Sequence, residues 1–161
     1  MDSFHPVRYF ITALLLGLTA CGPGKNAAAP TQAEAATPGD AGAGQRIYLR
    51  VCFVCHQPNG LGVPGAFPPL AGSTIVAGDP DRLIRIVLHG LQGPVEVNGT
   101  TFNNTMPAQG AVLKDFEIAN ALTYVRSAWG NHATPVTVEA VTHVRATVKR
   151  DTMWTWAELT K

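Results

Sequence analysis

The sequence predicts a small all-α domain over residues 41–131, with about three core helices separated by long loops. Three segments repeat apolar residues at the spacing of one helix face. Between them, residues 57–78 and 91–112 are rich in glycine and proline, which favours loops. A domain of about ninety residues with half its length in loops buries little apolar surface. We therefore expect a large apolar group to complete its core.

The helices are justified by their periodicity and their ends. The first is expected over residues 42–51, where the apolar residues share one face. The second should begin at Pro80 after the capping residue Asp79 and end before Gly90. Its large aliphatic residues are too many for one narrow stripe, so it should be largely buried. The third is expected over residues 115–128.

Two further features complete this outline. Asn98-Gly99 predicts a tight turn inside the second loop. Residues 132–161 are expected to form a C-terminal helical extension, with valines at helical spacing and a tail that contains Trp154 and Trp156. That tail either packs against its own domain, which is the simpler alternative, or docks a catalytic subunit.

The N-terminus has the pattern of a secreted protein. Residues 1–20 form a short apolar segment that suits a signal peptide and is too short to span a bilayer. The sequence Leu-Thr-Ala-Cys that ends at Cys21 resembles the lipobox of bacterial lipoproteins, in which the signal is cut before the cysteine and the cysteine is lipidated. Plain secretion with an incidental cysteine is the alternative.

The segment that follows Cys21 predicts a tether. Residues 22–40 lack aromatic and large aliphatic side chains and cannot offset their ordering entropy, so residues 21–40 are expected to be a lipidated cysteine and a disordered linker. The linker would reach about 25 Å. The domain is therefore expected on the periplasmic side of a bacterial membrane, lipid-anchored, with inner or outer membrane undecided.

The remaining cysteines lie in the motif Cys-Phe-Val-Cys-His, formed by Cys52, Cys55 and His56. Cys-x-x-Cys-His is the attachment signature of c-type haem. Thiols three positions apart on a helical turn reach two vinyl groups of one porphyrin, and the next imidazole lies beneath the iron. The motif therefore predicts one covalently bound haem c, which would also fill the core.

Other interpretations of the motif are weaker. A zinc site would need a second pair of ligands at suitable spacing, and the later histidines are widely separated. A thioredoxin-like dithiol would follow a strand and precede a helix, whereas here a helix precedes and a loop follows. A disulfide between Cys52 and Cys55 would leave His56 unexplained.

The chain resembles class I cytochrome c over residues 40–131. The resemblance rests on Gly44 and Tyr48 ahead of CFVCH, PPLAG at 68–72, TMPAQG at 105–110 and YVRSAWGN at 124–131. The stretch LHGLQGPVEVNG is similar to cytochrome subunits of periplasmic dehydrogenases and to cytochrome domains fused to copper nitrite reductases. The resemblance implies a small helical fold around one haem and single-electron transfer without catalysis.

The second iron ligand is expected to be Met106, which precedes Pro107 in a loop with no other apolar role. In the class I cytochrome c family, which the chain resembles, the distal ligand lies in such a Met-Pro loop. Ordinary core packing is the alternative for Met106. His89 and Met153 are rival ligands, although His89 also suits the end of a helix or a haem propionate.

The resemblance also assigns residues around the haem. It implies that the Pro68 carbonyl accepts the proton of the His56 ring and that Leu70 packs on the porphyrin. The alternative is that the prolines only stiffen the loop. Tyr48 and Trp129 are expected where the first and last helices cross.

These features predict a membrane-tethered, one-electron carrier with a His56- and Met106-ligated haem, or an electron-transfer subunit of a dehydrogenase or reductase. The expected partners are a redox protein and, through the lipid, a membrane. No nucleic-acid partner is expected, and the overall formal charge of +1 carries no information about partners. The alternative is a haem enzyme or ligand-binding haem protein whose sixth position is open or displaceable.

Overall fold

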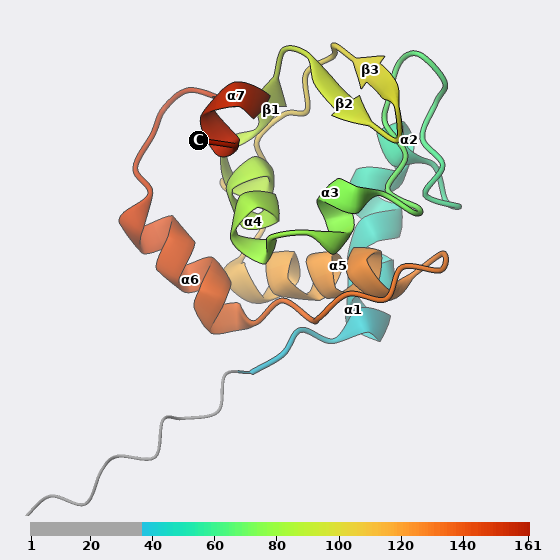
Figure 1. Ribbon diagram of the computed structural model, residues 1–161. Coiled ribbons are helices and arrows are strands. Elements are labelled where there is room, and N and C mark those ends of the chain that lie inside the picture. Colours follow the sequence, from blue (N-terminus) through green and yellow to red (C-terminus); the bar gives the residue numbers. More distant parts are fainter. Residues whose placement is uncertain (1–36) are drawn as a thin grey trace, which may run out of the picture. The chain divides into compact units, whose positions relative to one another are not determined.

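The computed structural model describes residues 37–161, so the predicted signal peptide, Cys21 and most of the predicted tether lie outside it. The described residues are mostly helical, as predicted (Figure 1). No helix among them is long and apolar enough to cross a membrane. The elements are α1 (Ala41–Ile47), η1 (Tyr48–Cys52), α2 (Phe53–His56), α3 (Thr74–Ala77), α4 (Pro80–His89), β1 (Leu91–Gln92), β2 (Val95–Val97), β3 (Thr100–Phe102), α5 (Asp115–Ser127), α6 (Val138–Thr147), β4 (Trp154–Thr155) and α7 (Trp156–Leu159).

The first helix is longer than its apolar periodicity predicts. α1, η1 and α2 follow one another without a break, so helical backbone continues through the Cys-x-x-Cys-His motif. Asp40 caps the start by accepting a hydrogen bond of 2.7 Å from the Gly42 N–H. In the middle, η1 is a π-helical turn in which the Phe53 N–H donates to the Tyr48 carbonyl. The helix stops at Gln57, whose φ of 60° no helix can continue.

The other two core helices lie where their local signals place them. Asp79 accepts a hydrogen bond of 3.0 Å from the Asp81 N–H and caps α4, and Gly90 follows its end with a φ of +83°. α5 begins after Lys114, whose N–H donates to the Glu117 carboxylate at 3.0 Å. The predictions of both helices are confirmed.

α1 and α5 cross at close range. A Cβ on Gly44 would overlap the carbonyl oxygen of Asn120, so only glycine permits this crossing. Beside it, Tyr48, Tyr124 and Trp129 form an aromatic cluster with ring centroids 4.9 to 5.5 Å apart. Tyr48 and Trp129 therefore lie at the crossing that the sequence predicts for them.

The C-terminal extension packs against the rest of the domain. Val136, Val141 and Val144 are buried in the same core cluster as residues of α1, α4 and α5. β4 pairs in parallel with β1 and is followed by α7. The tail therefore takes the simpler of the two predicted arrangements, on its own domain.

Two sequence predictions of loops need correction, because each loop contains an element. Residues 57–78 include α3, whose first turn is capped by Ser73. Residues 91–112 include the antiparallel hairpin β2–β3. The predicted Asn98-Gly99 turn joins its strands, and the positive φ values of these two residues, 51° and 77°, match a tight hairpin turn.

The predicted tether also needs a correction at its C-terminal end. Residues 37–40 are held against the domain, since the Gly39 N–H donates to Val136 O at 2.9 Å and the Asp40 N–H donates to Asn120 Oδ1 at 2.7 Å. These partners are distant in sequence and have no local signal. The ordered domain therefore begins before residue 41.

Candidate functional site

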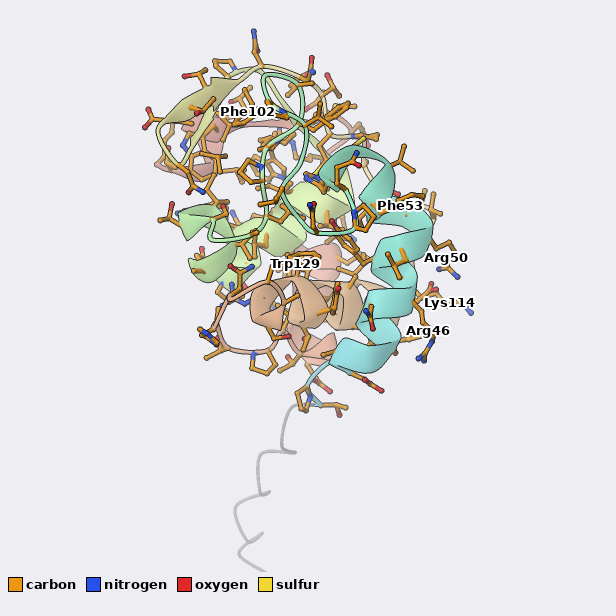
Figure 2. All side chains as sticks on the ribbon, turned by 90° about the vertical axis from the view of Figure 1, so that its right-hand side faces the viewer. Arg46, Arg50, Phe53, Phe102, Lys114 and Trp129 are labelled. Carbon is orange, nitrogen blue, oxygen red and sulfur yellow. The ribbon has the colours of Figure 1, made fainter. Side chains whose placement is uncertain are left out.

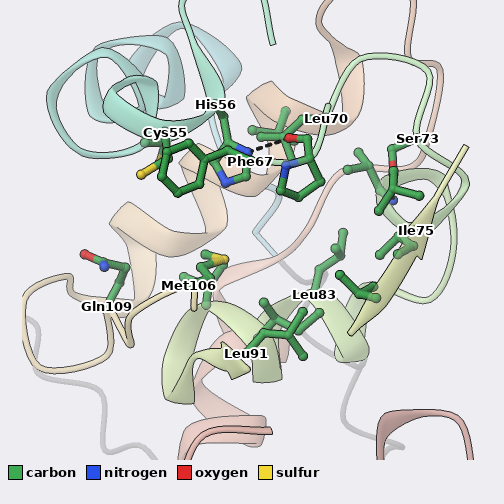
Figure 3. Close-up of a pocket in the computed structure, with 18 of the residues that line it drawn as sticks. Cys55, His56, Phe67, Leu70, Ser73, Ile75, Leu83, Leu91, Met106 and Gln109 are labelled. Atoms are coloured by element: carbon green, nitrogen blue, oxygen red, sulfur yellow. Dashed lines mark hydrogen bonds between the residues drawn. The ribbon is translucent and has the colours of Figure 1, made fainter. Parts of the chain in front are cut away.

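A large apolar cavity lies between the helical core and the hairpin (Figure 3). It encloses about 1370 Å³ of space, part of which is open to solvent. Its walls are mainly aliphatic and aromatic side chains from η1, α3, α4, α5, the hairpin and the loops at 67–70 and 104–109. The core gap that the composition predicts is therefore present.

The two thiols of the motif line one side of this cavity. Cys52 ends η1 and Cys55 lies in α2, and both are free thiols that are partly buried. Burial, with a smaller contribution from Cys55, raises the pKa of Cys52 to about 11. The motif thus presents two unpaired thiols to an apolar space.

His56 follows the thiols and enters the cavity from the end of α2 (Figure 3). Its side chain is buried, and Nδ1 lies 3.0 Å from the Pro68 carbonyl oxygen. A carbonyl only accepts, so Nδ1 carries the proton and donates it, which leaves the lone pair on Nε2. Burial lowers the pKa of His56, and the hydrogen bond to Pro68 opposes that shift. The ring is thereby held neutral, in the tautomer that a metal ligand requires.

The loop that carries Pro68 and Leu70 is fixed by Asn131, a residue that the sequence analysis missed. The buried Asn131 amide donates to Leu70 O at 3.0 Å and to Val125 O at 2.8 Å, and its oxygen accepts from the Gly72 N–H at 2.9 Å. All of these partners are backbone groups, so nothing in the sequence pattern points to them. Leu70 also lines the cavity.

Met106 enters the same cavity from the loop after β3 and lies across it from His56 (Figure 3). Neither rival ligand, His89 or Met153, is among the residues that line the cavity. His89 ends α4, and Met153 lies beside Gly90. The structure therefore brings together Cys52, Cys55, His56, Pro68, Leu70 and Met106, all of the site residues that the sequence predicts within the described range.

The hairpin forms a wall that the sequence analysis left as loop. Val95, Val97 and Phe102 are buried and line the cavity, and in β2 the two buried valines flank the exposed Glu96. A signal for this wall was available, because alternating apolar residues around Asn-Gly predict a hairpin.

These residues fit a flat apolar group attached at two points. The cavity offers apolar walls and two thiols, Cys52 and Cys55, three positions apart on one side of a helix. The His56 imidazole and the Met106 thioether face each other across it. Among residues 37–161, no three His, Cys, Asp or Glu side chains gather as a metal site of their own. A haem meets each of these features, since it supplies its own iron and a large apolar surface.

Fold and site together define a haem protein built for covalent attachment. The family model of cytochrome c matches residues 41–129, and the chain belongs to the cytochrome c family. It is 46% identical over 112 residues to cytochrome c-552 of Thermus thermophilus, covering 64% of this chain and 84% of that protein.

Cytochrome subunits of dehydrogenases are also similar. The chain is 39% identical over 103 residues to the cytochrome c subunit of the quinone alcohol dehydrogenase of Gluconobacter oxydans, covering 63% of this chain and 21% of that subunit. It is 36% identical over 109 residues to the cytochrome c subunit of gluconate 2-dehydrogenase of Pantoea cypripedii, covering 66% of this chain and 24% of that subunit. The prediction of a cytochrome c electron carrier with covalently bound haem c is thereby confirmed.

Proposed function

We propose that this cytochrome is a membrane-tethered, periplasmic one-electron carrier whose single haem c is held by Cys52 and Cys55 and ligated by His56 and Met106. The observation that carries this proposal is the pairing of a buried imidazole and a thioether in one apolar cavity. The haem, when bound, supplies an iron that changes between two oxidation states by one electron.

The chain's own residues hold and orient the group. Cys52 and Cys55 would hold the haem by adding each thiol S–H across one vinyl double bond, an addition that needs no leaving group. The Pro68 carbonyl fixes the His56 ring by its hydrogen bond of 3.0 Å and keeps Nε2 available as a ligand. Because these contacts are made before any electron moves, the site needs little rearrangement during transfer.

The pair of ligands also sets the chemistry. A soft thioether from Met106 favours the ferrous state and raises the reduction potential relative to two imidazoles. If His56 and Met106 both ligate the iron, no position would be left for a substrate. The mainly apolar walls would give the haem a surrounding of low polarity, which suits electron transfer.

The side of the domain that carries the thiols is the expected contact for redox partners. Phe53 and Val54, the two residues between the cysteines, are 37% and 65% exposed. Figure 2 shows Phe53 at the surface, on the same side of the domain as Arg46 and Arg50. An electron therefore has a short path from the attachment side of the cavity to the surface.

A dehydrogenase is the proposed source of electrons. The similar cytochrome subunits from Gluconobacter and Pantoea belong to dehydrogenases, which supports the same kind of partner here. The likeness covers under a quarter of their length, so it concerns one haem domain only. A carrier of this kind would bring one electron at a time from the enzyme to an acceptor at the membrane.

The membrane location is proposed from the lipobox-like sequence at Cys21. A cysteine with several acyl chains is stably anchored, and a tether keeps the domain close to membrane partners and raises their effective concentration. Cys21→Ser should move the protein from the membrane to the soluble fraction without changing its haem spectrum. Membrane retention of Cys21→Ser would contradict the anchor.

The ligands are tested by absorption spectroscopy of the matured protein. We expect a sulfur-to-iron band in the red region of the ferric spectrum and slow carbon monoxide binding by the ferrous protein, because Met106 must first leave the iron. A five-coordinate spectrum with rapid carbon monoxide binding would contradict the proposal and support a ligand-binding haem protein.

A further inference from the structure

The backbone of Met106 is tied to one residue, Leu91, at the start of β1. The Leu91 N–H donates to the Met106 carbonyl oxygen at 3.0 Å, and the Met106 N–H donates back to the Leu91 carbonyl at 2.9 Å. This antiparallel bridge uses the N–H and the carbonyl of Met106 together. The Met106 side chain therefore enters the cavity from a position that β1 defines.

The other edge of β1 pairs with the C-terminal tail. Leu91 lies in parallel register with Trp154 of β4, and the Trp154 N–H donates to Gly90 O at 3.1 Å. β1 is consequently the middle one of three extended segments, with Met106 on one side and Trp154 on the other. A strand of two residues has little stability of its own, so its position depends on both neighbours.

Gly90 is the point at which these segments meet. A Cβ at this position would lie 2.7 Å from the Met106 carbonyl oxygen and 3.1 Å from Met153 Cγ. The Met106 loop and the tail thus approach the same backbone atoms with no room for a side chain between them. Movement of the tail would therefore be passed on to the Met106 loop.

The tail is fastened to α4 by aromatic and charged side chains. We call residues 150–159 the C-terminal strap. Two guanidinium groups of α4 lie over its aromatic rings, Arg85 at 5.9 Å from the Trp154 ring centroid and Arg82 at 5.2 Å from that of Trp156. α7, at the end of the strap, lies above α4 and beside β1 (Figure 1). These contacts hold the strap in place independently of its strand pairing.

A second part of the C-terminal extension holds the far end of the Met106 loop. Arg145 of α6 donates to Gly110 O at 2.6 Å and to Leu113 O at 2.9 Å, and it forms an ion pair with Asp115. The loop between β3 and α5 is therefore bonded to Leu91 at Met106 and to Arg145 of the C-terminal extension at its far end.

We propose that the C-terminal strap is a positioning element for the Met106 sulfur, acting through β1. By restricting the movement of Leu91, the strap keeps the Met106 backbone, and with it the thioether, at the distance that the iron requires. This inference rests on the proposed ligation by Met106. It assigns residues 150–159 a role at the iron although none of them lines the cavity.

The test compares strap variants with a control of similar stability. Trp154→Pro removes the N–H that bonds to Gly90, while Trp154→Ala removes only the side chain; a chain that ends at Lys149 lacks the strap. Ile118→Val is the control, because Ile118 is buried in α5 and lies outside both the cavity and the strap. Carbon monoxide binding, the sulfur-to-iron band and hydrogen exchange of the Met106 amide are measured well below the unfolding temperature.

We expect Trp154→Pro to speed carbon monoxide binding and exchange of the Met106 amide by about fivefold to tenfold, as the loss of one hydrogen bond predicts for a local opening. Trp154→Ala should have a smaller effect and Ile118→Val none. The amide measurement reports on the loop backbone without relying on the iron.

Equal rates in Trp154→Pro, the shortened chain and Ile118→Val would overturn the inference and leave the strap a purely structural role. If the shortened chain does not fold, the two Trp154 variants of the full chain decide. A wild-type protein without the sulfur-to-iron band would refute the ligation and the inference together. A wild-type protein that has the band, with carbon monoxide binding and Met106 amide exchange that the strap variants do not change, would refute the inference alone.

Discussion

The two sides of the haem cavity are built in different ways. His56 is held by its own helix and by one carbonyl twelve positions along the chain. Met106 lies in a loop whose backbone bonds to the start of β1 and to the end of α4, and whose far end bonds to α6. One ligand is thus placed by local structure, and the other by contacts between segments that are distant in sequence.

This difference predicts an order of failure. Local opening begins where few cooperative contacts hold a segment, so the loop side should loosen before the helix side. The thiols and His56 share one helix and should remain attached while Met106 is displaced. The following experiments break or sharpen that contrast, from the largest expected effect to the smallest.

His56→Ala should have the largest effect, because it removes the ligand that follows the attachment thiols. We expect failure of covalent haem attachment, because no imidazole then orients the haem against the thiols, and, with the cavity unfilled, loss of helical structure. Intact mass and circular dichroism measure both. His132→Ala, at an exposed position, is the matched control and should keep the haem. A His56→Ala protein with the wild-type haem spectrum would contradict the proximal assignment.

Met106→Leu should keep the covalent haem and lose the sixth ligand. Leucine conserves the volume, so packing changes by less than about 1.5 kcal/mol before the lost iron–sulfur bond is counted. The ferric sulfur-to-iron band should vanish, the reduction potential should fall and carbon monoxide should bind faster. Met153→Leu removes the other candidate sulfur and should leave all three unchanged. If Met153→Leu caused these changes and Met106→Leu did not, Met153 would be the ligand instead of Met106.

Asn131→Ala tests the support of the His56 side. It removes an amide that bonds to Leu70 O, Val125 O and the Gly72 N–H, and it leaves buried backbone groups unpaired. We expect a loss of about 2–3 kcal/mol in the free energy of unfolding, measured by denaturant titration. Asn103→Ala, at an exposed position, should lose almost nothing. The sulfur-to-iron band should persist, and its loss would show that the two sides are not independent.

The smallest expected effect is a pH dependence of the stability of the C-terminal strap. Hydrogen bonds from the Thr155 N–H and hydroxyl, and then Arg150, lower the pKa of Glu158 from 4.5 to about 2. Because the folded pKa lies below the unfolded one, this carboxylate stabilises the strap above pH 4.5, and its contribution is lost as the pH falls towards 2.

The protection factor of the Trp154 amide, which corrects hydrogen exchange for its intrinsic pH dependence, should therefore fall in that acid range in the wild type. In Glu158→Gln the protection factor should already be lower at neutral pH and depend less on pH. An identical acid profile in both proteins would show that another group controls the strap.

The sequence predicts the helix side of this molecule better than the loop side, for a physical reason. The ends of α4 follow from Asp79, Pro80 and Gly90, which act on their immediate neighbours. By contrast, the Trp154 N–H bonds to the Gly90 carbonyl, and Arg145 bonds to the Gly110 carbonyl at the end of the Met106 loop. Neither hydrogen bond is indicated by the residues next to it in the sequence. Such contacts become evident only in the folded chain.

The candidate site shows the same division. Cys52, Cys55 and His56 follow from one contiguous motif, whereas Met106 and Pro68 were predicted through a resemblance rather than from their own neighbours. The hairpin wall was missed although Val95, Val97 and the Asn-Gly turn carry its pattern, because the many glycines and prolines around it favoured a loop. Asn131 had no signal at all.

The wide helical turn Tyr48–Cys52 has a consequence for changes in chain length. A π-helical turn accommodates one residue more than a regular turn while the helix on each side keeps its direction. Deleting a single residue within it should therefore restore a regular helix and leave the downstream thiols facing the cavity. The same deletion in the middle of α4 would rotate all later side chains by about 100°. Among the helices around the haem, this turn is where we expect natural or designed variants to differ by one residue.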